Sequence, residues 1–121
     1  AKAKSRAEPR LAPGSAVTVY KLGVVLLNLG RVQEAIAELG RANKLQPGMP
    51  ETLLELARAL TAGNDAAKAE PLLLEVVKIE GESILAESAH FQLAEIYRKL
   101  GRPADAQREM KRFKELKSKR P

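Results

Sequence analysis

The sequence contains no cysteine and no tryptophan, and only 3% of its 121 residues are aromatic. Without cysteine, structural disulfides and thiolate chemistry are excluded. With so few aromatic residues, the core must be built from Leu, Ala, Val and Ile, which favours helices over a β-sandwich or barrel. The longest uninterrupted apolar run covers residues 24–27, far short of the roughly 20 residues that span a bilayer. An apolar content of 45% is nevertheless enough to predict one folded domain with a modest core.

Groups that could carry catalysis are also scarce. There is a single histidine, and the sequence shows no GxGxxG, P-loop or HExxH motif. The carboxylates recur at helical spacing, as in Glu34 and Glu38, which is typical of a solvated helix face. An enzyme needs groups that exchange protons, attack a substrate or hold a metal. We therefore expect no enzymatic activity, no catalytic or metal-binding residues and no cofactor.

The net charge of +6 lies mostly at the two ends of the chain. Residues 1–10 carry four basic residues against one acidic residue, and residues 108–120 carry seven against two, so the middle has a net charge near −2. Residues 1–15 also contain Pro and Gly, which predicts a basic linker, and residues 118–121 are predicted to be a basic tail. The chain starts without Met or the apolar core of a signal peptide, and we interpret it as an excised piece of a longer protein or as a processed chain. We expect it to be soluble. Cytoplasmic and exported locations both remain open.

Short breaks divide the rest of the chain into six segments of helical periodicity. The breaks lie at residues 29–31, 46–48, 62–65, 80–82 and 100–103, and the segments between them have the length of ordinary globular helices. Gly30, Gly63 and Gly101 suit the left-handed residue that closes a helix. Pro71 falls inside the fourth segment, where we expect a kink or a one-residue bulge rather than a helix end.

The segments form a repeat. The residues Leu22, Leu26, Gly30 and Ala35 recur 71 positions later as Leu93, Tyr97, Gly101 and Ala106. This offset divides into 34 and 37, and a shift of 34 reaches an intermediate set of the same residue classes: Leu56, Leu60, Asn64 and Ala69. We assign the three additional residues to a loop at 84–86. The sequence thus predicts three helix-pair units at about 16–49, 50–83 and 87–117.

This pattern resembles the tetratricopeptide repeat, whose consensus is W-x2-L-G-x2-Y…A-x3-F…P over 34 residues. The first unit carries the matching residues Leu22, Gly23, Leu26, Ala35, Leu39, Ala42 and Pro47. Val19 and His90 stand at the Trp position of the first and third units, so His90 is interpreted as a packed side chain between helices. The resemblance covers about 100 of the 121 residues. It implies an all-α, right-handed solenoid of three antiparallel helix pairs that acts as a non-catalytic protein-interaction scaffold.

The resemblance also implies that the first helix of each pair lines a concave groove for a peptide or partner helix. The predicted groove residues are Tyr20, Val24, Leu27, Asn28, Leu54, Arg58, Phe91, Glu95 and Arg98. The same faces carry the further positions Glu55, Thr61, Gln92 and Lys99. Apolar side chains that cluster on an otherwise exposed face more often indicate a binding surface than a surface that merely faces water.

One well-known partner class for such grooves can be tested by residue type. Family members that grip the acidic C-terminal tails of chaperones use Lys and Asn on the first helix and Asn on the third. The matching positions here are Tyr20, Val24 and Glu55. None of them matches, and Glu55 would repel a carboxylate. The sequence argues against chaperone tails as partners and does not name the protein partner.

Two other functions stay open. The first helix is apolar nearly all round, so its surface could be covered by a preceding repeat, by the linker through Leu11, by the ligand or by a second copy. The last case would make the chain a self-association module. The basic last helix could bind nucleic acid or an anionic membrane through Lys111, Lys114 and Lys117, although no nucleic-acid motif accompanies these residues.

Overall fold

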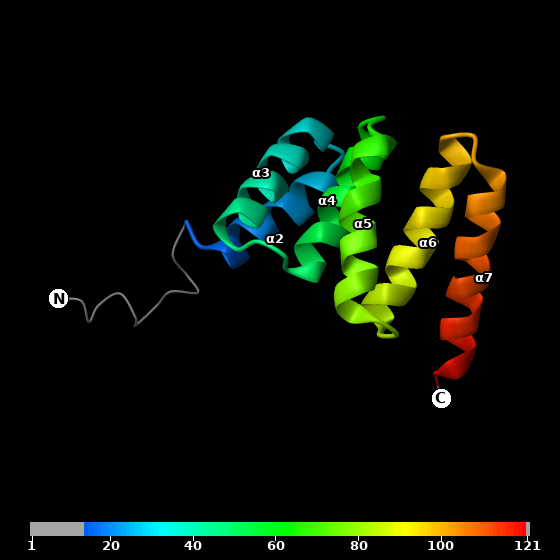
Figure 1. Cartoon of the computed structure of the whole chain (residues 1–121). Coiled ribbons are helices and arrows are strands. Elements are labelled where there is room, and N and C mark those ends of the chain that lie inside the picture. Colours follow the sequence, from blue (N-terminus) through cyan, green and yellow to red (C-terminus); the bar gives the residue numbers. More distant parts are fainter. Residues whose placement is uncertain (1–13, 121) are drawn as a thin grey trace.

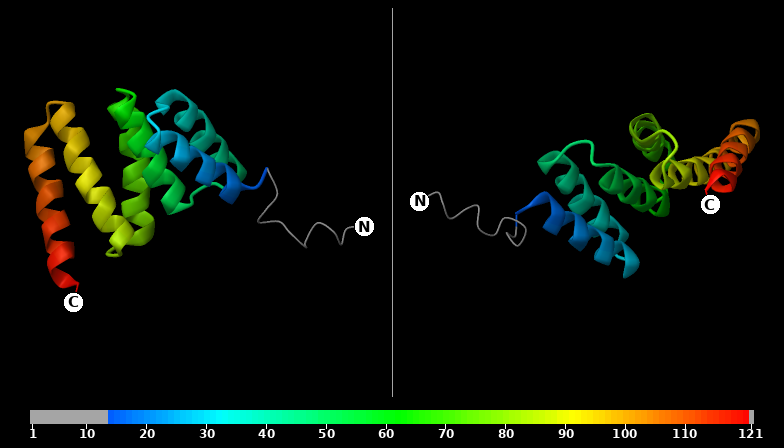
Figure 2. Two further views of the ribbon diagram at one scale, coloured as in Figure 1. Left: turned by 180° about the vertical axis from the view of Figure 1, so that it is seen from behind. Right: turned by 90° about the horizontal axis from the view of Figure 1, so that it is seen from below.

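The computed structural model describes residues 14–120 and shows six α-helices there (Figure 1). They are α2 (Ala16–Asn28), α3 (Val32–Leu45), α4 (Pro50–Ala62), α5 (Ala66–Glu80), α6 (Ile84–Lys99) and α7 (Pro103–Lys119). The range 14–120 contains no strand, which confirms the prediction of an all-α fold. Consecutive helices pair as α2 with α3, α4 with α5 and α6 with α7, and each pair packs on the next. Figure 2 shows the pairs stacked one after another, as in a solenoid.

Small residues let the two helices of a pair approach closely. Gly23 of α2 faces Leu39 of α3, and a Cβ atom on Gly23 would lie 2.5 Å from the Leu39 Cγ. Ala57 and Ala94 take the corresponding places in α4 and α6, and both are fully buried. Large apolar side chains fill the seams around them and form one core that runs through all three pairs.

The turns inside the pairs need a residue with positive φ. Gly30 and Gly101 supply it in the first and third pairs, with φ of 81° and 73°. In the second pair it is Asn64 that adopts φ of 66°, while Gly63 has φ of −88°. The prediction for Gly63 was therefore wrong by one residue, because Asn tolerates the left-handed region better than most residues with a side chain.

The three additional residues of the third unit are helical. Ser83 is the N-cap of α6, and its hydroxyl accepts hydrogen bonds from the backbone N–H groups of Leu85 and Ala86. Residues 84–86 thus form the first turn of α6 and not the predicted loop, because a Ser with an extended backbone starts a helix at the next residue. The unit boundaries themselves stay a prediction.

Two other predictions, on the basic tail and on Pro71, concern residues that lie in helices of the structure. Residues 118 and 119, predicted to be a tail, belong to α7, and α5 runs through Pro71 without ending. The predicted linker lies outside the described residues except for its last two, Gly14 and Ser15, and Ser15 caps α2. Pro121 also lies outside the described residues.

Candidate functional site: the concave groove

The first helices of the three pairs are neighbours, since α4 contacts both α2 and α6. Between α4 and α6 lies an open hollow of about 320 Å³. It is lined by Arg58, Thr61, Ala62, Phe91, Gln92, Glu95 and Lys99. The structure thus brings together three of the predicted groove residues, Arg58, Phe91 and Glu95. Ala62 was not predicted, although it follows Thr61 at the position that corresponds to Lys99 in α6.

The remaining predicted groove residues have different surroundings. Tyr20, Val24 and Leu27 are half-buried and pack against the core, and Asn28 is exposed at the end of α2. Arg98 is exposed, but it lines a separate hollow on the α7 side together with Pro103, Gln107 and Met110. The hollow between α4 and α6 therefore takes in only part of the predicted set of groove residues.

Leu54 was expected on the exposed face and is instead only 6% exposed, within the core. The next pair covers it, as the Gln92 Nε2 approaches the Leu54 carbonyl oxygen at 3.5 Å. Phe91 holds the corresponding position in α6 and remains 42% exposed. Its ring packs on one side against Phe113 of α7, with centroids 5.2 Å apart. Of these two predicted groove residues, Phe91 lines the α4–α6 hollow and Leu54 does not.

Charged groups surround Phe91. Arg58 pairs with Glu55 one turn earlier on α4, and Arg98 pairs with Glu95 on α6 at 2.9 Å. Lys99 makes no ion pair with any residue of the range 14–120. At the other end of the groove, burial raises the pKa of Tyr20, and the negative charges of Glu55 and Glu51 raise it further. The hollow thus combines an exposed aromatic ring with the two cations Arg58 and Lys99.

Comparison with known proteins agrees with this architecture. A tetratricopeptide-repeat family model matches residues 26–90, and a second model of the same repeat matches residues 88–112. The chain belongs to the tetratricopeptide repeat family. Proteins of this family serve as scaffolds for protein–protein interaction, and they are generally not catalytic.

Solved structures show the same tetratricopeptide fold. The chain is similar to MamA, with 22% sequence identity and a TM-score of 0.80 over 90% of this chain and 62% of that one. It is also similar to a putative kinesin light chain from Podosopora anserina with nearly identical TPR-like repeats, with 25% identity and a TM-score of 0.72 over 91% of this chain and 59% of that one. The chain thus spans about six-tenths of the length of these two structures. No curated protein sequence matches it.

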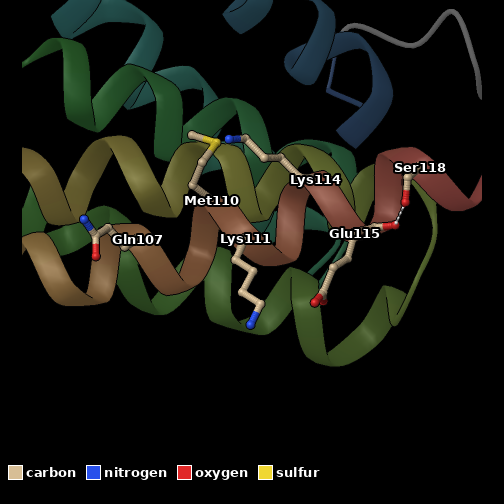
Figure 3. A pocket seen from close by; sticks show the side chains of 6 residues that line it. All are labelled: Gln107, Met110, Lys111, Lys114, Glu115 and Ser118. Carbon is tan, nitrogen blue, oxygen red and sulfur yellow. Dashed lines mark hydrogen bonds between the residues drawn. The ribbon is translucent and has the colours of Figure 1, made fainter.

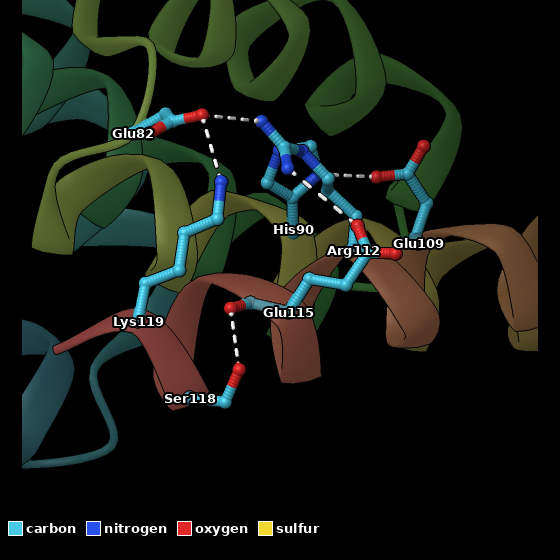
Figure 4. Close-up of polar contacts among 7 residues, drawn as sticks. All are labelled: Glu82, His90, Glu109, Arg112, Glu115, Ser118 and Lys119. Atoms are coloured by element: carbon cyan, nitrogen blue, oxygen red, sulfur yellow. Dashed lines mark hydrogen bonds and ion pairs between the residues drawn. The ribbon is translucent and has the colours of Figure 1, made fainter.

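The basic end of this tetratricopeptide array is partly neutralised within the chain. The Glu82 carboxylate pairs with Lys119 at 3.2 Å and with Arg112 at 3.4 Å, as Figure 4 shows. These hydrogen bonds and charges, led by Lys119, lower the pKa of Glu82. Arg120 makes a two-pronged ion pair with Glu87, at 2.8 and 3.0 Å.

Three lysines of α7, namely Lys111, Lys114 and Lys117, make no ion pair within the range 14–120. Lys111 and Lys114 flank a shallow hollow on the outer side of α7 (Figure 3). Lys117 lies over the Phe113 ring, 5.7 Å from its centroid. The basic character of the last helix is therefore much smaller than its composition indicates.

His90 lies inside the third pair, 6% exposed between α6 and α7. Its Nδ1 is 2.6 Å from the Glu109 Oε1 (Figure 4), and its Nε2 is buried without a hydrogen-bond partner in the described part of the chain.

The described residues contain no group of three or more His, Cys, Asp or Glu arranged to hold a metal ion. None of the helices in that part is both long and apolar enough to cross a bilayer.

Proposed function

We propose that this tetratricopeptide array is a non-catalytic module that holds a peptide or a partner helix against the α4–α6 part of its groove. The observation that carries the proposal is Phe91, which is 42% exposed above a hollow of about 320 Å³. A half-exposed aromatic ring that borders a hollow is the usual anchor of a protein interface. Phe113, which does not line the hollow, packs against the ring, so little conformational entropy would be lost on binding.

The charges of the hollow indicate the chemistry of the partner. Arg58 and Lys99 border it from α4 and α6, and Glu95, one turn before Lys99 on α6, pairs with Arg98. A segment with an apolar side chain for the Phe91 surface and a carboxylate for Lys99 would complement this arrangement. Both an extended peptide and an amphipathic helix can offer that pair at a short spacing.

The groove is tested by selecting peptides from a random phage-displayed library against the whole chain. Binding of the selected peptides is then measured by fluorescence anisotropy for the wild type and for the variants Phe91→Ser and Lys99→Glu. We expect each variant to weaken binding by roughly tenfold or more, as for a central anchor of an interface. The matched control is Leu74→Ser on α5, which removes a side chain of similar exposure, 46%, from outside the groove.

Two outcomes would contradict the proposal. One is that no peptide is selected, and the other is that Phe91→Ser and Lys99→Glu bind as well as Leu74→Ser does. Helical circular dichroism of all variants distinguishes a lost contact from a lost fold, because Phe91 also touches Phe113.

Anion binding by the last helix has weaker support, since Arg112, Lys119 and Arg120 are already paired with Glu82 and Glu87. Lys111, Lys114 and Lys117 are the lysines of α7 without an ion pair in the range 14–120. Three phosphate contacts give a shallower dependence of affinity on salt than the six to ten of a typical nucleic-acid-binding protein. If binding to single-stranded DNA or to anionic vesicles falls steeply between low and physiological salt, that result would support anion binding as the function.

A further inference from the structure

A second hollow adjoins the one beside Phe91. It has a volume of about 410 Å³ and lies between the α4–α5 turn and the end of α6. Asn64 and Asp65 line it from the turn, and Lys99 lines it from α6. Because Thr61 and Lys99 line both hollows, the two form one cleft between the second and third helix pairs. We call it the interpair cleft.

Both walls of the interpair cleft belong to helix pairs that the structure describes, so neither wall depends on what precedes α2 or follows α7. Gln92, Glu95 and Lys99 form one stripe of α6 at spacings of three and four residues. At the same positions of α4, which has a pair packed on either side, the side chains stay at least partly exposed. These α4 residues are Glu55, Arg58 and Ala62. The stripe therefore stays open inside the array.

One positive charge of the interpair cleft is not compensated. Four charged side chains line the cleft, and three of them have partners outside it, in the pairs Arg58–Glu55, Glu95–Arg98 and Asp65–Lys68. The fourth, Lys99, is exposed and makes no ion pair with any residue of the range 14–120. An unpaired ammonium group attracts a carboxylate. The ligand that complements the cleft therefore brings one negative charge to Lys99.

Two amide side chains of the interpair cleft remain for hydrogen bonds with a ligand. The Asn64 side chain makes no hydrogen bond within the range 14–120, and Gln92 makes one, the 3.5 Å contact from its Nε2 to the Leu54 carbonyl oxygen. An amide offers donors and an acceptor, which the N–H and C=O groups of an extended chain need and which a helix supplies for itself. The lining thus favours an extended segment over a helix.

We propose that the interpair cleft binds an extended acidic segment of a partner protein, with an Asp or Glu side chain on Lys99 and a large apolar side chain on Phe91. This inference rests on the proposed function and specifies its ligand. Phe91 and Lys99 are eight residues apart on α6, which is about 12 Å along the helix. Four residues of an extended chain cover about 13 Å and place both side chains on one face. The acidic and the apolar residue of the ligand therefore lie four positions apart.

The carboxylate belongs to a side chain of the ligand and not to its C-terminus. The second hollow continues past Lys99 to Asn64 and the start of α5, whereas the first continues to Phe91. A ligand that ended at Lys99 would leave one of the two hollows empty, whichever way its chain ran. An internal acidic residue lets the chain occupy both. This requirement agrees with the argument against chaperone tails from Tyr20 and Glu55.

The ligand is tested with random peptides that are displayed on phage between two linkers, so that no peptide has a free C-terminus. Selection against the whole chain should enrich peptides with Asp or Glu four positions from a large apolar residue, relative to the unselected library. An enriched peptide is then synthesised with blocked termini, and its binding is measured by fluorescence anisotropy. Selected peptides without this motif would overturn the proposal, and so would a peptide that becomes helical on binding, as measured by circular dichroism.

A double-mutant cycle tests the contact with Lys99. Replacement of the acidic peptide residue by its amide should weaken binding by roughly threefold to tenfold, and Lys99→Gln should do the same, since each removes one charge of an exposed pair. The two changes together should weaken binding little more than either one, because both remove the same contact. The matched control is Lys111→Gln, which removes another exposed and unpaired charge, on the outer side of α7, and should leave binding unchanged.

The outcomes separate this inference from the groove itself. Peptides that need Phe91 but bind Lys99→Gln as well as the wild type would overturn the acidic ligand and leave the proposed function standing. Effects that simply add in the cycle would show that Lys99 does not contact the carboxylate, and they would also overturn the inference. Peptides that bind Phe91→Ser as well as the wild type would contradict both.

Discussion

The two ends of the array follow the same two-helix plan but expose different side chains. The N-terminal end presents Leu22, Val25 and Leu29 on α2, without a charge among them. The C-terminal end is covered by lysines on α7 and by ion pairs that join α7 to α6 and to the turn before it. Since the fold of the pairs is the same, the difference lies in the side chains of the end faces alone.

This difference separates an end face with charged side chains from an end face with apolar ones. Terminal repeats need a polar outer face for solubility, and α7 has one. The outer face of α2 instead resembles the faces that α4 and α6 bury against the preceding pair. The comparison therefore predicts that substitutions at corresponding positions of the two end pairs change the free energy of unfolding by unequal amounts.

The largest loss of stability is expected from substitutions between the two helices of a pair. Leu39 of α3 is fully buried, and its counterpart Met110 of α7 is partly exposed. Leu39→Ala should lower the free energy of unfolding by about 3 kcal/mol, because a cavity remains in a tightly packed site. Met110→Ala should cost about 1 kcal/mol, because solvent already reaches that side chain. Urea denaturation followed by circular dichroism measures both values, and equal losses would show that the two pairs are equally well packed.

A second difference between the end pairs concerns the position where the two helices of a pair approach most closely. Gly23→Ala would place a Cβ 2.5 Å from the Leu39 Cγ and 3.3 Å from the Leu39 backbone nitrogen. We expect a net loss of about 1–2 kcal/mol, although alanine alone would favour the helix by about 1 kcal/mol. The reverse change in the third pair, Ala94→Gly, should lose about 1 kcal/mol through backbone entropy. A more stable Gly23→Ala protein would mean that Leu39 moves aside and that the approach is not tight.

Much of this architecture could be predicted from the spacing of residues. The recurrence of Leu26, Gly30 and Ala35, by residue class, in two later units reports mainly on the packing and the turn inside one helix pair. The positions of the helices followed from it. The turn at Asn64 was displaced by one residue because Gly63 and Asn64 can both follow a helix C-terminus, and composition does not distinguish them.

The candidate site was harder to predict because it depends on contacts between pairs. Tyr20, Leu54 and Phe91 hold the same position in three helices, yet Leu54 is buried and Phe91 is 42% exposed. The following pair covers Leu54, whereas Phe91 is contacted by Phe113 of its own pair and by no following pair within the described residues. Exposure in a repeat array is thus set by the neighbouring repeat, and the spacing within one repeat carries no information on it.

A smaller effect is expected from the ion pairs at the two ends. Glu87 has a side chain only 10% exposed and is held by Arg120, whereas Arg31 and Glu34 near the N-terminal end are both more than half exposed. Arg120→Ala should cost about 1 kcal/mol, because it leaves a nearly buried carboxylate without its partner. Arg31→Ala should change the free energy of unfolding by less than about 0.5 kcal/mol, as exposed pairs do. Equal costs would mean that the C-terminal end gains nothing from its ion pair.

The smallest effect concerns the two tyrosines, one in each end pair. Burial raises the pKa of both, and the Tyr97 hydroxyl also donates a 2.7 Å hydrogen bond to the Glu70 carboxylate, which brings its pKa to about 12. No such bond is among the causes of the pKa shift of Tyr20, where burial and the charges of Glu55 and Glu51 raise the pKa and the charge of Arg58 lowers it. The absorbance of tyrosinate should therefore appear first from Tyr20 and later from Tyr97, and the variants Tyr20→Phe and Tyr97→Phe assign the two steps.

The same titration has a consequence for stability. A raised pKa means that the folded state favours the neutral phenol, so the contribution of Tyr97 is complete below pH 10 and is lost as the pH rises towards 12. The free energy of unfolding should fall more steeply over this range for the wild type than for Tyr97→Phe, which has no proton to lose there. Tyr20→Phe should show a smaller difference from the wild type. The reverse order would place the tighter tyrosine environment in the N-terminal pair and remove this contrast between the ends.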